Sequence, residues 1–300
     1  MSIADTLGIL LISTIRMCTP ITLAAVGGVF SARVGVMALG LEGFMLMGAF
    51  GAAWGSFMTQ NAFLGLLCGV ALATVYSLVF ALLCVVFSVN QVICGIGLNL
   101  FASGFTASMT QLVWGNRANS DIVPTLPHLN LPLIGDLSPL IPLMLVIVAV
   151  SWFYLFRTPW GLRLRMVGEN TPAAKSIGIN ALRYKFMGVA ISGMLCGLAG
   201  SFLAIDHVNR FVREMTAGRG FIAVAVNILG RFNPAGALGG GLLFGFTDSL
   251  STVISSDTVP GQLLQMIPYA ATLFVIVFAV KYVSAPAGMG KPMDEGSTKG

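Results

Sequence analysis

The sequence predicts an all-α protein, a polytopic bundle of transmembrane helices. Composition gives the first evidence: 56% of the 300 residues are apolar and only 9% are charged, whereas soluble domains carry about a quarter charged residues. The second observation is that mostly apolar stretches of about 20 residues, the length of a membrane-spanning helix, follow one another along the chain. A soluble fold of this size could not bury so much apolar surface, and the 36 glycines suit close helix packing in lipid.

Taken in order, the apolar stretches give about nine spans. The seventh is short and the second carries Glu42, so either is a candidate for a broken or partly inserted helix. The predicted spans cover residues 7–30, 35–58, 62–89, 91–114, 139–157, 186–206, 218–231, 236–256 and 263–283.

Basic residues set the orientation, because cytoplasmic loops of membrane proteins are enriched in Lys and Arg. The strongly basic connection 158–185 is therefore predicted to be cytoplasmic, which places the N-terminus outside and the C-terminus inside. The same rule accounts for the net charge of +5 without nucleic-acid binding. The basic residues of this connection and its edge are Arg157, Arg163, Arg165, Lys175, Arg183 and Lys185.

The order of the spans predicts one transmembrane domain, 1–283, built from two inverted repeats of four helices. Repeat one covers about 7–114 and repeat two about 186–283, with the fifth span and the loop 158–185 between them. Inverted repeats recur in transporters. The small and polar residues 284–300 are predicted to form a disordered cytoplasmic tail.

Within the cytoplasmic loop, GENTPAAKSIGIN predicts a helix of about two turns. Thr171 suits the N-cap, Pro172 the first helical position, and Gly178 the position after the last turn. Ala173 and Ala174 give this helix a small-residue face. Such a face fits a docking element for a partner as well as it fits a plain connector.

Polar groups inside spans are candidates for a solute pathway, since burying them in lipid is costly. Glu42 fits a pathway or gate residue, but also a structural carboxylate that fixes a loop, caps a broken helix or pairs with Arg33. Gln91, Asn99 and Asn227 fit a pathway for a polar solute, or hydrogen bonds between helices.

Enzymatic chemistry has little support in the sequence. The two histidines, His128 and His207, fall in predicted external connections. Metal-ligand spacings, a nucleophile elbow and a phosphate-binding glycine loop are all absent from the sequence. We therefore expect no cofactor in this chain, and if ATP drives the protein, ATP and Mg must bind to a partner chain.

An ordered set of short motifs carries a family resemblance. The motifs are 28–35 (GVFSARVG), 39–43 (LGLEG), 90–99 (NQVICGIGLN), 161–170 (GLRLRMVGEN), 217–225 (AGRGFIAVA) and 230–234 (GRFNP). The chain resembles permeases of ABC importers for simple sugars, nucleosides and branched-chain amino acids. It is most similar to the nucleoside branch, which works with a lipoprotein receptor of the basic-membrane-protein class. The family often has Glu-Arg before position 35 and Asn near 38, where this chain has Ala32-Arg33 and Ala38.

The resemblance implies a permease subunit of the bacterial cytoplasmic (inner) membrane that translocates a nucleoside. It implies three partners: a second, related permease subunit in a heterodimer, a cytoplasmic ATP-binding subunit, and an extracytoplasmic substrate-binding lipoprotein. It also implies that the short cytoplasmic helix is the coupling helix, which docks on the ATPase. The residues assigned to the coupling helix and its flanks are Glu169, Asn170, Thr171, Pro172, Ala173, Ala174, Lys175 and Gly178.

Other functions stay open at this point. A monosaccharide or a branched-chain amino acid is an alternative substrate within the same family. A secondary carrier or channel acting alone, and a membrane anchor or intramembrane enzyme, are alternatives outside it. The capped cytoplasmic helix disfavours a carrier acting alone, and the missing catalytic residues disfavour an enzyme.

Overall fold

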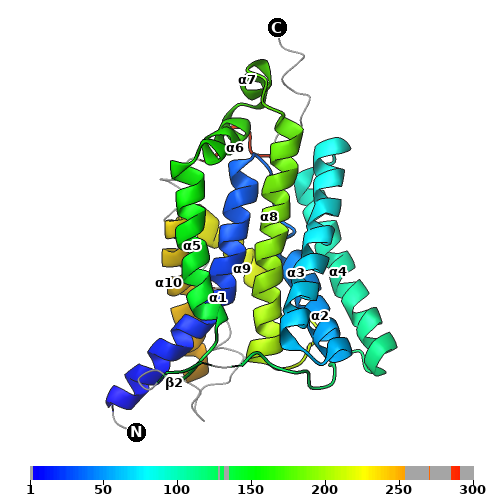
Figure 1. Cartoon of the computed structure of the whole chain (residues 1–300), viewed down its shortest axis with the longest axis vertical. Coiled ribbons are helices and arrows are strands. Elements are labelled where there is room, and N and C mark those ends of the chain that lie inside the picture. The colour runs from blue at the N-terminus through cyan, green and yellow to red at the C-terminus, as the bar shows by residue number, and fades with distance from the viewer. Residues whose placement is uncertain (1–2, 128, 132–134, 254–269, 271–284, 291–300) are drawn as a thin grey trace.

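The computed structural model describes residues 3–127, 129–131, 135–253, 270 and 285–290, which form a bundle of helices (Figure 1). The helices are α1 (Ile3–Arg33), α2 (Leu41–Thr59), α3 (Ala62–Ala81), α4 (Gln91–Trp114), α5 (Leu140–Arg157), α6 (Pro159–Glu169), α7 (Thr171–Ser176), α8 (Ala181–Phe202), α9 (Arg219–Leu229) and α10 (Pro234–Val253). Two π-helical turns, η1 (Leu82–Val86) and η2 (Leu203–His207), extend α3 and α8. The predicted all-α membrane fold is confirmed, with one short unpredicted hairpin of β1 (Leu129–Leu131) and β2 (Gly135–Leu137).

Five of the described helices are long and apolar enough to cross a membrane. They are Leu10–Arg33, Ala62–Val86, Gln91–Trp114, Leu140–Arg157 and Ala181–His207. These correspond to the first, third, fourth, fifth and sixth predicted spans, while α2, α9 and α10 lie at the second, seventh and eighth. The ninth predicted span, 263–283, lies outside the described residues except for residue 270. The count of nine spans and the two inverted repeats therefore stay predictions.

The second helix begins later than the sequence predicts, at Leu41 instead of position 35. Gly35 adopts a positive φ of 80°, and its N–H donates to the carbonyl of Ala32 at 2.9 Å, which ends α1. A left-handed glycine directly after the last helical turn is a common C-terminal stop. The segment 34–40 is consequently a non-helical connection, although its residues are apolar.

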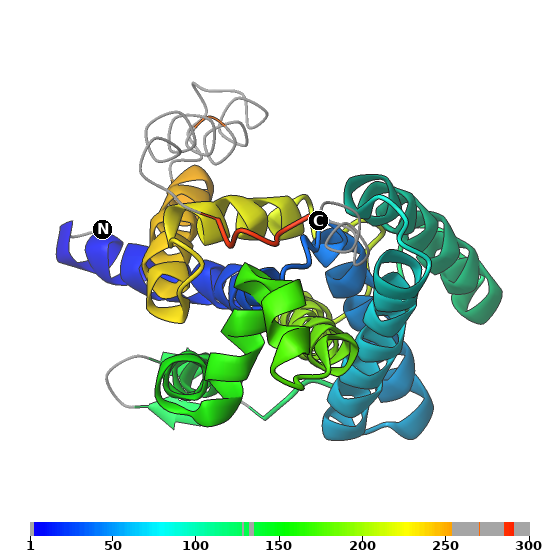
Figure 2. The ribbon, with the colours of Figure 1, turned by 90° about the horizontal axis from the view of Figure 1, so that it is seen from above.

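The central helix of the bundle is α1. Every residue from Cys18 to Ala32 is buried, because α1 packs against α5, α8, α9 and α10. Figure 2 shows α1 between these four helices. The middle of α2 is buried in the same way against α3 and α8.

Small residues allow the close packing of α2, α3 and α8. A Cβ on Gly48 of α2 would lie 2.7 Å from the Cα of Gly197 in α8, and a Cβ on Gly55 would lie 2.6 Å from the Cβ of Cys68 in α3. Real Cβ atoms do not approach this closely, so a side chain at either glycine would force the helices apart.

The two ends of the bundle are different. The N-terminus, the hairpin and the connections 115–127 and 208–218 lie at the lower end in Figure 1, with α6 and α7 at the upper end. The two lower connections pair with each other, since the N–H of Ser120 donates to the carbonyl of Phe211 and that of Arg213 to the carbonyl of Ala118. This arrangement fits the predicted orientation, in which the basic loop and the N-terminus lie on opposite sides.

Candidate functional site

The carboxylate of Glu42 binds the N-terminal end of α9. Its Oε1 accepts hydrogen bonds from the hydroxyl of Thr216 at 2.6 Å and the N–H of Gly218 at 2.9 Å, and its Oε2 accepts from the N–H of Gly220 at 2.7 Å. The N-terminus of a helix carries unsatisfied N–H groups and a partial positive charge, which together favour a carboxylate. Of the interpretations that the sequence left open, the geometry matches the cap of a short helix.

The glycines before and within α9 make this contact possible. Gly218 has a positive φ of 78°, and a Cβ on Gly220 would lie 2.7 Å from Oε2 of Glu42. The sequence Ala217-Gly-Arg-Gly220 therefore lets the backbone of α9 come within hydrogen-bonding distance of α2. Glu42 does not pair with Arg33, whose Nε donates to the carbonyl of Phe232 at 2.8 Å.

One face of α4 holds the connection between α1 and α2. Gln91 accepts from the N–H of Met37 at 2.6 Å. Asn99 donates to the carbonyl of Leu39 at 2.9 Å and accepts from the N–H of Gly43 at 2.8 Å. These amides satisfy backbone groups that the non-helical segment leaves without partners. Of the hydrogen bonds between helices that the sequence offered as the alternative, only the one from Gly43 of α2 to Asn99 is present, and the other two bonds reach the non-helical segment.

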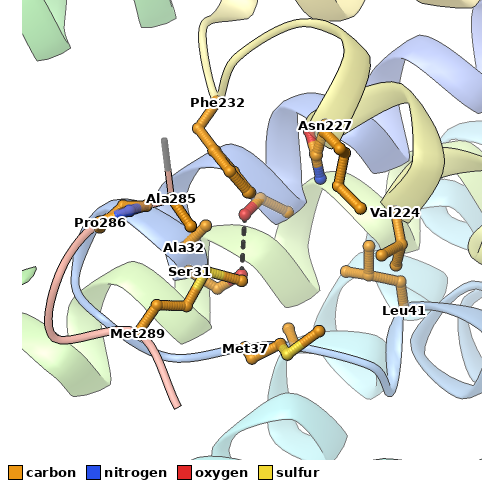
Figure 3. A pocket seen from close by; sticks show the side chains of 13 residues that line it. Ser31, Ala32, Met37, Leu41, Val224, Asn227, Phe232, Ala285, Pro286 and Met289 are labelled. Atoms are coloured by element: carbon orange, nitrogen blue, oxygen red, sulfur yellow. Dashed lines mark hydrogen bonds between the residues drawn. The ribbon is translucent and has the colours of Figure 1, made fainter. Parts of the chain in front are cut away.

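A cavity of about 370 Å³ lies between α1, α9 and the segment 37–41 (Figure 3). Its wall is mainly apolar, and the side chain of Asn227 points into it from α9. Asn227 is only 4% exposed, and its Oδ1 has no hydrogen-bond partner among the described residues. A buried amide oxygen without a partner costs about 1–3 kcal/mol. The lining residues are Gly28, Ser31, Ala32, Met37, Ala38, Leu41, Val224, Asn227, Ile228, Phe232, Ala285, Pro286 and Met289.

Three of the four predicted pathway residues therefore bind other segments of the protein, and one lines the cavity. Gln91 and Asn99 bond to the backbone around the start of α2, and Glu42 bonds to the segment at the start of α9. Asn227 alone among the four lines the cavity. The sequence analysis missed Gly95, whose absent Cβ would lie 2.9 Å from the side chain of Leu39. The spacing of Gln91, Gly95 and Asn99, four residues apart, was the available signal that one helix face approaches a backbone segment.

The predicted cytoplasmic helix exists as α7, at the end of the molecule farthest from the N-terminus (Figure 1). Its N-cap is Asn170 and not Thr171, because the Asn170 side chain accepts from the N–H of Ala173 at 3.0 Å. Thr171 is the first helical residue, which moves Pro172 to the second position, and its hydroxyl donates to the carbonyl of Val167 at 2.8 Å. Gly178, with a positive φ of 81°, follows the helix as predicted.

The two alanines of α7 differ in exposure. Ala173 is exposed, whereas Ala174 is only 1% exposed. The small-residue face of the helix is therefore split between an outward side and a side packed on the permease. The connection 158–185 is also more structured than a loop, because it contains α6 and the first turn of α8.

The segment 285–290 lies between the last turn of α6 and the cavity, which Ala285, Pro286 and Met289 help to line. The N–H of Ala287 donates to Oε2 of Glu169 at 3.1 Å, and the N–H of Gly288 donates to the carbonyl of Gly168 at 2.9 Å. The N–H of Gly290 donates to the carbonyl of Gly35 at 3.3 Å. These residues differ from the predicted disordered tail, because backbone hydrogen bonds fix them between α6 and the end of α1.

The helical bundle and its polar interior define a multi-pass membrane protein. A family model described as "Branched-chain amino acid transport system / permease component" matches residues 10–278, so the chain belongs to this family of membrane permeases. Together with the relatives below, this match makes the chain a permease subunit of an ABC importer, as predicted.

Two characterised relatives are similar over nearly their full length. The chain is 35% identical to the guanosine ABC transporter permease protein NupQ of Bacillus subtilis, over 99% of each chain. It is 32% identical to the nucleoside ABC transporter permease protein NupC of Lactococcus lactis, over 97% of this chain and 98% of that one.

A solved structure supports the fold. It is described as an inward-facing conformation of an ABC transporter of the metal-chelate type, and it has a TM-score of 0.52 at 15% identity. The similarity covers 89% of this chain and 86% of that chain. Because the sequences are so different, the shared feature is the helical architecture alone.

Proposed function

We propose that this permease carries a nucleoside across the bacterial cytoplasmic membrane. The observation that supports the substrate class is the near full-length similarity to one guanosine and one nucleoside permease. The chain itself performs no hydrolysis in this proposal: ATP and Mg bind to a cytoplasmic ATPase subunit, and an extracytoplasmic lipoprotein delivers the nucleoside.

The cavity beside Asn227 supports a small solute with both an apolar face and hydrogen-bonding edges. A volume of about 370 Å³ lies at the lower end of the range for small-molecule sites. Met37 and Phe232 offer apolar surface to a flat base, and the amide of Asn227 can both donate and accept. A base or ribose bound there would supply the missing partner of Oδ1.

For coupling, we propose that α7 docks on the ATPase subunit and moves the cytoplasmic end of α1. Gly168, in the last turn of α6 directly before α7, packs against the carbonyl of Arg33 with no room for a side chain. Arg33 in turn donates to the carbonyls of Phe232 at 2.8 Å and Arg231 at 3.4 Å, in the turn after α9. A displacement of α7 would thus reach two walls of the cavity, α1 and α9, through backbone contacts.

The outward face of α4 supports the proposed second permease subunit. Only 22% of the apolar membrane-spanning stretch of α4 is buried. Gly97 and Gly104 on its open face have no neighbour within 4 Å of an added Cβ, and Ile93 and Leu100 beside them are 69% and 71% exposed. Exposed glycines seven residues apart on an apolar helix favour close approach of another helix.

Uptake into reconstituted vesicles tests the substrate. Vesicles that contain both permease subunits, the ATPase and the receptor should accumulate labelled guanosine or uridine only when ATP is supplied to the ATPase side. Ribose and leucine are the matched comparisons, since they represent the alternative substrate classes. Import of ribose or leucine without import of a nucleoside would contradict the proposal.

A further inference from the structure

A second hollow lies at the cytoplasmic end of the bundle, away from the cavity beside Asn227. It has a volume of about 820 Å³ and is formed by α6, the turn 177–180 and the first two turns of α8. Figure 1 shows α6 across the upper ends of α5 and α8. The lining residues are Pro159, Trp160, Leu162, Arg163, Met166, Ile177, Gly178, Ile179, Asn180, Arg183, Tyr184 and Met187.

The electrostatics of this hollow favour an anion. Arg163 and Arg183 line it, and none of its lining residues is acidic. In the described part of the chain, neither arginine forms a salt bridge with a carboxylate. Two helices also begin at its rim, α6 at Pro159 and α8 after its N-cap Asn180, and both N-termini add partial positive charge.

The position of the hollow places that anion at the membrane surface. The span Leu140–Arg157 ends two residues before Pro159, and the span Ala181–His207 begins directly after Asn180. Trp160 is 55% exposed, and its ring centroid lies 6.4 Å from that of Tyr184 and 5.8 Å from the guanidinium carbon of Arg163. Trp and Tyr beside Arg are typical of the level of the lipid headgroups.

A separate apolar groove lies farther along α8, toward the middle of the membrane. It has a volume of about 360 Å³ and lies between α5 and α8, with Phe30 of α1 also lining it. On α8, Arg183 and Met187 line the hollow, and Ile191 and Leu195 line the groove. Residues four apart share one helix face, so both spaces follow the same side of α8.

We propose that the hollow and the groove together bind one anionic phospholipid of the cytoplasmic leaflet. Arg163 and Arg183 hold the phosphate, the N-terminus of α8 faces it, and an acyl chain lies along Ile191 and Leu195 between α5 and α8. The lipid fills the space that α5 and α8 leave between them and fixes α6, the helix that leads into α7. This site is independent of the transported substrate.

A segment of the ATPase subunit is the competing occupant, because the hollow adjoins α7. The groove favours the lipid, since Val146, Val150 and Ile191 continue the site to a depth that only a membrane component reaches. A free phosphate ion would use the two arginines but would gain nothing from the groove.

Native mass spectrometry of the full transporter in detergent tests the proposal, with phosphatidylglycerol and phosphatidylcholine as probes. We expect phosphatidylglycerol to stay bound and phosphatidylcholine to be lost. The double substitution Arg163→Gln and Arg183→Gln should weaken phosphatidylglycerol binding roughly 30-fold, because each basic residue near an anionic lipid contributes about a factor of five. Arg157→Gln, at the same depth but outside the lining, is the matched control and should bind normally.

A second pair of variants tests the groove without changing charge. Val150→Trp should fill the groove and reduce phosphatidylglycerol binding, whereas Leu145→Trp, on an exposed face of α5 outside the groove, should not. Added inorganic phosphate should not displace the lipid. Equal binding of both lipids, displacement by phosphate, or loss of the ATPase subunit from the arginine variant with lipid binding unchanged would each overturn the proposal.

Discussion

At the scale of single residues, the interior of this permease holds a carboxylate through two backbone N–H groups and one hydroxyl. Glu42 accepts three hydrogen bonds from the segment that leads into α9, and no lysine or arginine side chain is among these donors. Hydrogen bonds to a charged acceptor are stronger than neutral ones, and removing the acceptor leaves each buried donor unsatisfied. The start of α2 is thereby bound to the start of α9.

We expect Glu42→Ala to lower the free energy of unfolding by about 3–5 kcal/mol and Glu42→Gln by about 1–2 kcal/mol. Gln keeps one oxygen for Thr216 and Gly218 but presents an amide N–H₂ to Gly220. Thermal unfolding of the purified subunit measures the change in stability of each Glu42 variant. Glu214→Gln, in a connection at the lower end of the bundle, is the control and should change stability by less than about 0.5 kcal/mol. Unchanged stability of both Glu42 variants, with transport lost, would instead favour a gate residue.

Two asparagines should respond in opposite ways. Asn227→Ala should not lower the unfolding temperature, since it removes a buried oxygen without a partner among the described residues, and it should raise the KM for nucleoside uptake about tenfold, the value of one hydrogen bond to the solute. Asn99→Ala should lower stability by about 1–3 kcal/mol, because it removes the partners of Leu39 and Gly43. Parallel uptake and unfolding measurements separate the two. Normal uptake by Asn227→Ala would exclude Asn227 from the pathway.

At the scale of elements, α7 is a short helix that depends on its neighbours. Six residues are too few for a stable isolated helix in water. The Asn170 cap and the buried Ala174 hold it in place, and Glu169, at the end of α6 just before it, accepts a hydrogen bond from the N–H of Ala287. Its exposed side, with Ala173, is free to meet a partner.

We expect Ala173→Glu to leave the permease folded and inserted, while co-purification of the ATPase subunit and ATP-driven uptake both fall by tenfold or more, about 1.4 kcal/mol of binding. The added carboxylate would be buried without a partner in the docked complex. The control is Gln60→Glu. Gln60 is exposed and directly follows the last residue of α2, far from α7, so this variant should bind the ATPase normally. Ala174→Glu is a poor test, since it would break the packing of α7 itself. Firm ATPase binding by Ala173→Glu would make α7 a connector only.

At the scale of the whole molecule, the two ends of the bundle expose different elements. The basic elements α6 and α7 lie at one end, and the paired connections 115–127 and 208–218 lie at the other (Figure 1). The pairing fixes these two connections to each other at the lower end.

Single cysteines in a cysteine-free background should report this orientation. We expect an impermeant thiol reagent added to intact cells to label Asn116→Cys strongly and Lys175→Cys less than about a tenth as well, since the bilayer blocks the reagent. Both residues are exposed, so access to the side chain itself does not differ. After the cells are opened, both positions should be labelled. Strong labelling of Lys175→Cys in intact cells would reverse the predicted topology.

Properties that depend on a continuous stretch of chain could be predicted from the sequence. The spans 91–114 and 139–157 match α4 and α5 to within a residue, because hydropathy and length suffice to define a spanning helix. The N-cap of α7 was predicted wrongly, as Thr171 instead of Asn170. Both Asn and Thr are good N-caps, the two residues are adjacent, and only the backbone conformation at Asn170 selects between them.

The sequence by itself determined that this chain crosses a membrane as a helical bundle, and its ordered motifs determined the permease family. The tertiary structure decided which polar groups satisfy one another and which face a cavity. Glu42, Gln91, Asn99 and Asn227 look alike along the chain, but three of them bind backbone groups, and the side-chain oxygen of the fourth has no partner among the described residues. The reason is physical: hydrophobicity is a property of each residue and its close neighbours, whereas a hydrogen bond depends on the distance between segments that only folding brings together.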